Sequence, residues 1–364
     1  MPYKISGTKS ETARIIIIKE SDWSIESNTV ISGSGAYEVD NLEFGNKAVI
    51  ARNNDGSIQG YGVVATVFGP GDRGVFGGGN LGNNVFSNTV EYVTISHLSN
   101  ASNFGDLTEE RWNPAATSNG GNSRGVFGGG ESGDNFNIID YVTITTIGDA
   151  SDFGDFIGWK KLEGACSNGT NDRGLFGGGQ IAAGTTNIID YITISSTGNS
   201  QDFGDLTVAR NYIAACSNGT NDRGIFGGGT TGSLSDVIDY VTITSTGNAD
   251  DFGNLTVARY ALAATSNSTS NRGVFAGAYT AQNVMDYITI TSIGNASDFG
   301  DLTYARGFMD GTSNGVNDRG LFAGAMYSGY NRNIDYITIS TTANAQDFGD
   351  LGDNRGGPAA TSNA

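Results

Sequence analysis

Short stretches in which apolar and polar residues alternate recur along most of the chain, and Gly, Asn, Asp and Ser separate them. An alternation of period two is typical of a β-strand that is buried on one face, and the separating residues are typical of turns. In the fourth copy of the pattern, strands are predicted over 212–218, 223–229, 239–243 and 251–255. The chain is therefore expected to belong to the all-β class.

Three short motifs repeat along the chain, with successive copies 47 to 51 residues apart. An Arg-Gly pair followed by an apolar residue and Phe begins at Arg73, Arg124, Arg173, Arg223, Arg272 and Arg319. A Tyr preceded by Asp or Glu recurs at Tyr92, Tyr141, Tyr191, Tyr240, Tyr287 and Tyr336. A Phe-Gly pair recurs at Phe104, Phe153, Phe203, Phe252, Phe299 and Phe348. Six similar four-stranded units predict a six-bladed β-propeller, because closing the ring hides most strand edges.

The repeat has glycines after its second strand, an aromatic residue in the third and an Arg beyond the fourth. With the segments GVFGGG, GLFGGG and GIFGGG and the VAR triplets that end at Arg210 and Arg259, residues 63–364 resemble the kelch repeat. The chain departs from kelch in lacking the Trp of the outer blade, and the Phe of DFGD is expected to replace it. The resemblance implies a kelch-like propeller.

Two domains are predicted, a small β-sandwich over 1–62 and the propeller over 63–364. Counted from the second strand of each blade, the repeats start near 73, 124, 173, 223, 272 and 319. The terminal segment 358–363 copies the first-strand segment at 114–119, so it is expected to close the ring beside 73–79. Segment 63–68 competes for the same place and is the alternative.

The first domain does not share the repeat and is predicted to hold strands over 13–20, 35–39 and 47–52. Its segment GAYEVDNLEFGNKAVIA resembles the carboxypeptidase-regulatory or transthyretin-like β-sandwich. A small all-β domain ahead of a propeller is interpreted as a docking domain.

The formal net charge is −18, and residues 63–364 carry fourteen Lys or Arg against thirty Asp or Glu. This balance disfavours nucleic acid, whose phosphates need clustered cations. The sequence has no apolar run of about 18 residues, and its first residues lack the apolar core of a secretory signal. Membrane insertion and standard export are therefore not expected.

Few residues are suited to catalysis or metal binding. His97 is the one histidine, so a multi-histidine metal site and the copper-radical oxidase chemistry known on kelch propellers are excluded, and His97 is interpreted as a surface residue. The two cysteines, Cys166 and Cys216, stand where other repeats have Thr. They are interpreted as packed thiols too far apart for a disulfide.

Carboxylates recur in register at Asp106, Asp155, Asp205, Asp301 and Asp350. A residue repeated in every blade is expected to serve folding, either by accepting backbone N–H bonds or by pairing with the repeated Arg residues. No catalytic residue and no cofactor are predicted. Calcium in the Asn- and Asp-rich loops is the alternative.

The loops differ in how much they vary between copies. Loops between the first and second and between the third and fourth strands are nearly identical, whereas those on the opposite face differ in nearly every copy. This variable face carries the candidate ligand-binding residues Trp112, Trp159, Tyr212, Tyr260, Phe308, Tyr327, Tyr330 and Arg332. The aromatic side chains can stack on sugars or anchor a protein interface, and the alternative is that several of them pack at blade edges.

The repeat segments DFGDLT, RGVFGGG and IDYITI together resemble virion structural proteins of tailed bacteriophages. The resemblance implies a non-enzymatic tail fibre, appendage or capsid decoration protein, assembled in the host cytoplasm and located in the virion. Residues 1–62 would contact other virion proteins, the propeller would bind a host-surface glycan or protein, and the chain would form a homo-oligomer on the particle. A cellular kelch-type scaffold and a glycan-cleaving enzyme are the alternatives.

Overall fold

The computed structural model describes residues 72–133, 136–267, 270–280, 282–326 and 329–364, together with the backbone of six strands between Tyr3 and Val67. The chain divides into two compact units, Met1–Gly69 and Pro70–Ala364. In the part of the chain that the structure describes, no helix has the length and apolar character needed to cross a membrane.

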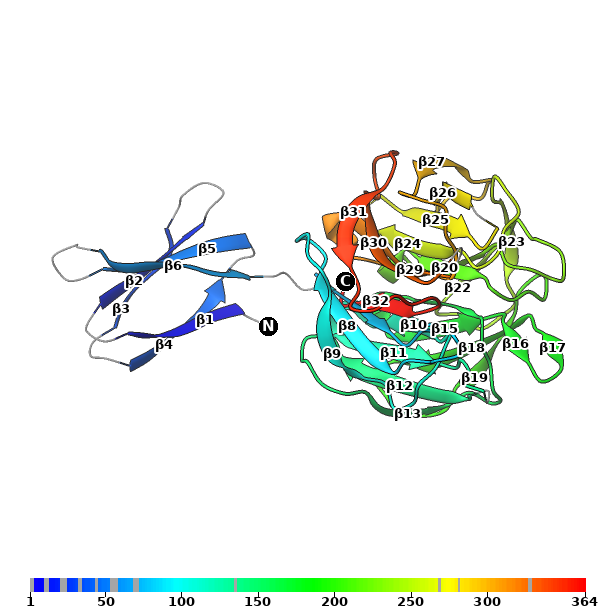
Figure 1. Ribbon diagram of the computed structural model, residues 1–364, viewed down its shortest axis with the longest axis horizontal. Coiled ribbons are helices and arrows are strands. Elements are labelled where there is room, and N and C mark those ends of the chain that lie inside the picture. The colour runs from blue at the N-terminus through cyan, green and yellow to red at the C-terminus, as the bar shows by residue number, and fades with distance from the viewer. Residues whose placement is uncertain are drawn as a thin grey trace. The chain divides into compact units, whose positions relative to one another are not determined.

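The second unit is a six-bladed β-propeller, as the repeats predict (Figure 1). Each blade is a four-stranded antiparallel sheet, and the first strands of neighbouring blades lie next to one another around the centre. The first blade consists of β32 (Ala359–Ser362), β7 (Arg73–Gly77), β8 (Thr89–Thr94) and β9 (Ser102–Asp106). The second consists of β10 (Ala115–Ser118), β11 (Arg124–Gly128), β12 (Ile138–Thr143) and β13 (Ser151–Asp155). The third consists of β14 (Gly164–Ser167), β15 (Arg173–Gly177), β18 (Ile188–Thr193) and β19 (Gln201–Asp205).

The remaining blades have the same plan. The fourth consists of β20 (Ala214–Ser217), β21 (Arg223–Gly227), β22 (Val237–Thr242) and β23 (Asp250–Asn254). The fifth consists of β24 (Ala263–Asn267), β25 (Arg272–Ala278), β26 (Gln282–Thr289) and β27 (Ser297–Asp301). The sixth consists of β28 (Asp310–Ser313), β29 (Arg319–Ala325), β30 (Asn331–Thr338) and β31 (Gln346–Asp350). Short additions are a hairpin, β16 (Gln180–Ile181) with β17 (Gly184–Thr185), and the 3-10 turns η1 (Gly120–Asn122), η2 (Gly169–Asn171), η3 (Gly219–Asn221) and η4 (Gly315–Asn317).

The ring closes through the C-terminal strand. β32 pairs with β7, and Thr361 lies opposite Val75. The side-chain oxygen of Asn363 accepts a bond of 3.0 Å from the Arg73 N–H, as Asn119 does for Arg124 in the second blade. The terminal segment therefore reproduces the hydrogen bonding of an ordinary first strand.

The competing segment 63–68 belongs to the other unit. Strand β6 (Ile58–Val67) pairs with β5 (Gly45–Arg52), in a four-stranded sheet with β2 (Ala13–Lys19) and β3 (Ile25–Ile31). Strands β1 (Tyr3–Lys9) and β4 (Gly35–Leu42) form a second sheet. The unit boundary consequently falls after Gly69, beyond the predicted residue 62. The resemblance to a carboxypeptidase-regulatory sandwich stays a prediction.

The core lies between the blades, where the Phe of each second strand packs against the preceding blade. A Cβ added at Gly227 would lie 2.6 Å from Cε1 of Phe275 in the next blade. The fifth and sixth blades have Ala276 and Ala323 at the equivalent position, but in the other four blades a glycine ends the segment and allows this close contact between sheets. This explains why the segment recurs almost unchanged.

Buried ion pairs fasten each inter-blade connection to the third strand of the following blade. The pairs are Arg111–Asp140, Lys160–Asp190, Arg210–Asp239, Arg259–Asp286, Arg306–Asp335 and Arg355–Glu91. The carboxylate of each buried pair is the residue directly before the repeated Tyr. The Asp of the Phe-Gly-Asp segment had been expected as the partner of the repeated Arg, and for the buried pairs that expectation was wrong. Of that set, Asp350 forms a surface pair with Arg332 at 3.3 Å.

Candidate functional site

Six residues, one from each inter-blade connection, surround the propeller axis with left-handed backbones. Their φ angles lie between 51° and 63°. The members of this axial ring are Asn113, Leu162, Tyr212, Ala261, Phe308 and Gly357. Because a left-handed backbone costs a non-glycine residue about 1–2 kcal/mol, the ring must be imposed by its surroundings.

Backbone hydrogen bonds connect neighbouring members of the axial ring. The N–H of Tyr212 donates to the oxygen of Leu162 at 2.8 Å, and that of Ala261 to Tyr212 at 3.0 Å. The N–H of Phe308 donates to Ala261 at 2.9 Å, and that of Gly357 to Phe308 at 2.7 Å. The N–H of Asn113 donates to Gly357 at 3.1 Å. The left-handed conformation is therefore accompanied by hydrogen bonds that run around the axis.

An aromatic cluster adjoins the axial ring. The ring centroid of Phe308 lies 5.6 Å from Trp112, 5.4 Å from Tyr212 and 5.1 Å from Tyr279. Tyr260 lies 5.4 Å from Tyr212 and 5.6 Å from Tyr279. These five rings line a hollow of about 700 Å³, which we call the aromatic bowl. The other residues that line it are Thr230, Gly232, Ser233, Leu234 and Met326.

The aromatic bowl lies on the face formed by the variable loops. Backbone bridges join Trp112 to Glu131 and Asn211 to Thr230, so the inter-blade connections adjoin the turns between second and third strands. Both loop types contribute to the bowl, since Tyr260 comes from a connection and Tyr279 from a turn. Residues from the second, fourth, fifth and sixth blades thereby meet in one site.

The bowl itself carries no charged side chain. None of the residues that line it is Asp, Glu, Lys, Arg or His. Burial raises the pKa of Tyr212, and the nearby charge of Glu131 raises it further. Burial also raises the pKa of Tyr260. Both phenols are therefore neutral at physiological pH and able to donate a hydrogen bond.

Four of the eight candidate residues come together in the bowl, namely Trp112, Tyr212, Tyr260 and Phe308. The other described candidates lie elsewhere: the Trp159 ring is 5.9 Å from Lys161 Nζ, Tyr330 packs over Gly82, and Arg332 pairs with Asp350. Tyr327 lies outside the described residues. The sequence prediction missed Tyr279, which occupies a position that differs between blades.

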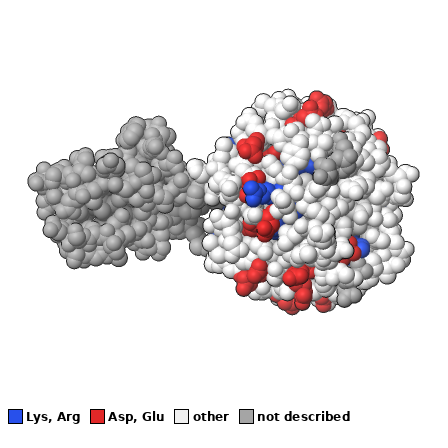
Figure 2. Space-filling view, viewed as in Figure 1, with Lys and Arg blue, Asp and Glu red and all other residues white. Residues whose placement is uncertain are grey.

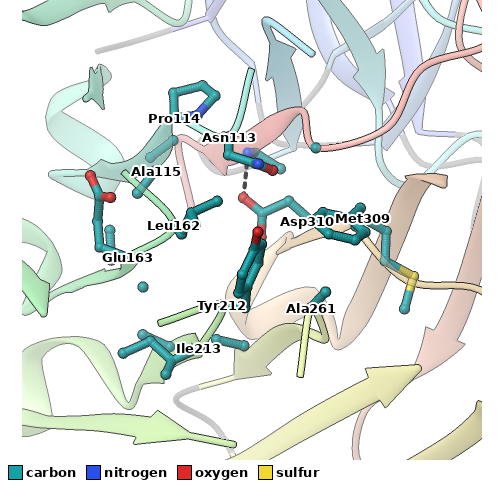
Figure 3. A pocket seen from close by; sticks show the side chains of 18 of the residues that line it. Asn113, Pro114, Ala115, Leu162, Glu163, Tyr212, Ile213, Ala261, Met309 and Asp310 are labelled. Carbon is teal, nitrogen blue, oxygen red and sulfur yellow. Dashed lines mark hydrogen bonds between the residues drawn. The ribbon is translucent and has the colours of Figure 1, made fainter. Parts of the chain in front are cut away.

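A smaller cavity of about 90 Å³ adjoins the bowl on the axis, and Tyr212 and Phe308 line both spaces (Figure 3). Its lining includes Glu163 and Asp310, which sequence analysis also missed. Burial raises the pKa of Glu163 to about 8 and that of Asp310 to about 7. Asp310 is half-buried and accepts bonds from the N–H groups of Ala360 and Gly311.

Glu163 and Asp310 differ from the residues at the equivalent positions of the other blades, and this difference could have identified them from the sequence. Glu163 stands where the other blades have Pro114, Ile213, Leu262, Met309 and Pro358. Asp310 stands where they have Ala115, Gly164, Ala214, Ala263 and Ala359. In Figure 3 the two side chains come from different parts of the lining, with Glu163 well apart from Asp310.

Other candidate groups are in ordinary surroundings. His97 is exposed in the turn after β8, as predicted. Cys166 and Cys216 are buried free thiols, and burial raises the pKa of Cys166 to about 12. Among the described residues, no three His, Cys, Asp or Glu side chains are grouped so that they could hold a metal ion.

No protein-family model matches the chain, and no curated protein matches it either.

Proposed function

We propose that this chain is a non-enzymatic recognition protein of a bacteriophage particle, and that its propeller contacts the host surface through the aromatic bowl. The observation that carries the proposal is the meeting of five aromatic rings in one hollow of about 700 Å³. That volume lies within the range of about 300–1,000 Å³ that is typical of ligand sites. The phage setting rests on the resemblance of the repeat segments to virion structural proteins.

Binding is favoured over catalysis because the bowl lining holds no His, Asp, Glu, Lys or Cys side chain that could act as a general base. Its hydroxyl groups belong to Tyr, Thr and Ser side chains, with no histidine or carboxylate among the lining residues. Glu163 and Asp310 line the adjoining cavity, whose 90 Å³ is well below the volume of a typical substrate site. A glycan-cleaving activity would need both carboxyls to reach a sugar.

The acidic surface of the propeller disfavours binding to nucleic acid. On the face drawn in Figure 2, acidic side chains are scattered over the propeller and cationic ones are few. The remainder of the proposal follows the sequence resemblance: the first unit attaches the chain to other virion proteins, and the chain acts as a homo-oligomer in the particle.

Binding to whole cells tests the host-contact part of the proposal. The purified chain should bind cells of the bacterium on which the particle grows, and Trp112→Ala or Tyr260→Ala should weaken that binding. Tyr330→Ala is a matched control, because the Tyr330 ring packs over Gly82 outside the bowl. Retained binding by both bowl variants would place the contact elsewhere.

Copurification tests the phage setting. The chain should remain with purified particles through density-gradient centrifugation. Its absence from particles, combined with capture of a host protein, would favour the cellular scaffold.

A further inference from the structure

We infer that the aromatic bowl binds an uncharged pyranose, such as the end of a neutral polysaccharide. This inference rests on the proposed function and names the chemical class of the ligand for the same site.

The aromatic walls suit a sugar ring. The five rings are tilted or edge-on to one another, with interplanar angles of 35° to 89°, so they present both faces and edges to the hollow. The C–H groups on the flat side of a pyranose are weakly positive, and the face of an aromatic ring is negative. Stacking of a sugar on such a wall is therefore attractive without any charge.

Polar groups at the same site match sugar hydroxyls. Tyr212, Tyr260 and Tyr279 bring phenol groups to the lining, and Thr230 and Ser233 bring hydroxyl groups. The Thr230 hydroxyl accepts a bond from the Gly232 N–H and donates to the oxygen of Ser233, which holds this turn in place. A hydroxyl can both donate and accept, as a sugar hydroxyl does.

The absence of charge from the bowl lining selects against acidic and basic ligands. A carboxylate or ammonium placed in the bowl would lose hydration and gain no opposite charge from a lining residue. The nearest charges described above, Glu131 and Lys161, form an ion pair with one another at 2.5 Å. The chain as a whole is acidic, with a net charge of −18, which further disfavours sialic and uronic acids.

A compact ligand fits better than a protein surface. Outside the bowl, exposed apolar side chains include Ile157, Val208 and Val257. Val208 and Val257 occupy equivalent positions in successive connections, and Ile157 lies one position earlier in the connection before them, so the symmetry of the propeller keeps the three apart. An interface of ordinary size would need a broader apolar centre than the bowl supplies.

Titration with a panel of uncharged sugars tests the inference. The probes are methyl glycosides and short oligomers of glucose, galactose, mannose, rhamnose and N-acetylglucosamine, measured by calorimetry on the full chain. At least one should bind, with a dissociation constant that is unchanged between low and high salt because no charge is involved. Sialylated and uronic-acid oligomers should bind at least about tenfold more weakly.

Matched variants locate the binding. Tyr260→Ala and Tyr279→Ala should each weaken affinity about tenfold, as expected for removal of a stacking ring, whereas Tyr330→Ala should leave it unchanged. Thermal melts of all three variants check that each is folded. A folded Tyr260→Ala chain with undiminished sugar affinity overturns the inference, as does a panel in which nothing binds.

Treated cells separate failure of the inference from failure of the proposed function. Mild periodate, which cleaves vicinal diols of sugars, should abolish binding to cells, and proteinase treatment should not. If proteinase abolishes bowl-dependent binding and periodate does not, the ligand is a protein and only the inference fails. If untreated cells are not bound at all, the proposed function fails.

Discussion

The guanidinium group of Arg319 donates a hydrogen bond of 3.0 Å to the carbonyl oxygen of Ile95. Arg319 begins a strand of the last blade, and Ile95 follows a strand of the first, so this bond crosses the join of the ring. The same bond links every other pair of neighbouring blades, with donors at Arg73, Arg124, Arg173, Arg223 and Arg272. Each guanidinium also lies over the Tyr ring of its own blade, at 4.7 Å in the case of Arg319 and Tyr336.

The Arg-to-carbonyl bond at the join of the ring has the same geometry as the bonds between the other blades. Arg319→Ala and Arg223→Ala should therefore destabilise the propeller to a similar extent. Each variant loses one charge-assisted hydrogen bond and one cation–π contact, for an expected cost of about 1–3 kcal/mol. Urea unfolding of both variants measures it. A much larger loss for Arg319→Ala would identify the join as the weak point of the ring.

Removal of Arg210 should be among the most damaging changes in the propeller. Its side chain and that of Asp239 are fully buried, and they form an ion pair of 2.6 Å. Arg210→Ala would leave a buried carboxylate without its partner, which costs about 3–5 kcal/mol. Arg210→Lys should be much milder, since Lys160 makes the equivalent pair with Asp190 at 2.6 Å.

The double variant Arg210→Met with Asp239→Leu tests whether the pair itself stabilises the fold. Replacing both charges with apolar groups removes the desolvation cost along with the attraction. We expect the double variant to be more stable than Arg210→Ala alone, as chemical denaturation would measure. A double variant that is no more stable than Arg210→Ala would contradict this account and would show that the ion pair contributes more than its burial costs.

Glu163 should make stability depend on pH. Its pKa is about 8 in the folded chain, above the ordinary value of 4.5, because burial disfavours the carboxylate. Between those values the folded chain retains a proton that the unfolded chain has lost, so stability falls as pH rises, by up to about 1.4 kcal/mol per pH unit. Glu163→Ile, which copies Ile213 of the next blade, removes this dependence and should stabilise the chain most near pH 8.

Thermal or urea unfolding at pH 5 and pH 8 measures the effect of Glu163→Ile. The gain in stability over the unaltered chain should be larger at pH 8 than at pH 5. Glu110→Gln, at an exposed position, is a control that should show little difference between the two pH values. An equal gain at both pH values would mean that Glu163 is ionised in the folded chain.

Residues that repeat in every blade allowed the fold to be predicted from the sequence. Arg73 and its equivalents mark the second strand, and the copy of PAATSN at the end of the chain predicts the closing strand. The partners in the buried ion pairs were harder to predict. The positions of Asp140 and Asp106 both recur from blade to blade, and only the packed structure shows that Asp140 is the one that pairs with an Arg.

The site was predictable only in part, because it depends on contacts between distant segments. Trp112 and Phe308 come from connections in different parts of the ring, and only ring closure brings them to 5.6 Å. Tyr279 stands where other blades have Asn80, Glu131, Gln180, Thr230 and Met326, a variation that marks the position without indicating its role. The raised pKa of Glu163 follows from burial, which local sequence does not show.

Gly357 should be required for the position of Trp112. A Cβ at Gly357 would overlap the indole Nε1 of Trp112 and the side-chain oxygen of Asn113, and the φ angle of 62° adds backbone strain. Gly219 has a φ angle of 57° with nothing within 4 Å of an added Cβ, so Gly219→Ala incurs the strain alone, about 1 kcal/mol. Gly357→Ala should cost clearly more in urea unfolding and shift the tryptophan fluorescence. Adding Trp112→Ala should recover part of that difference, because it removes one of the two overlapping groups. Equal costs for Gly357→Ala and Gly219→Ala would show that Trp112 moves aside freely and is not held by the axial ring.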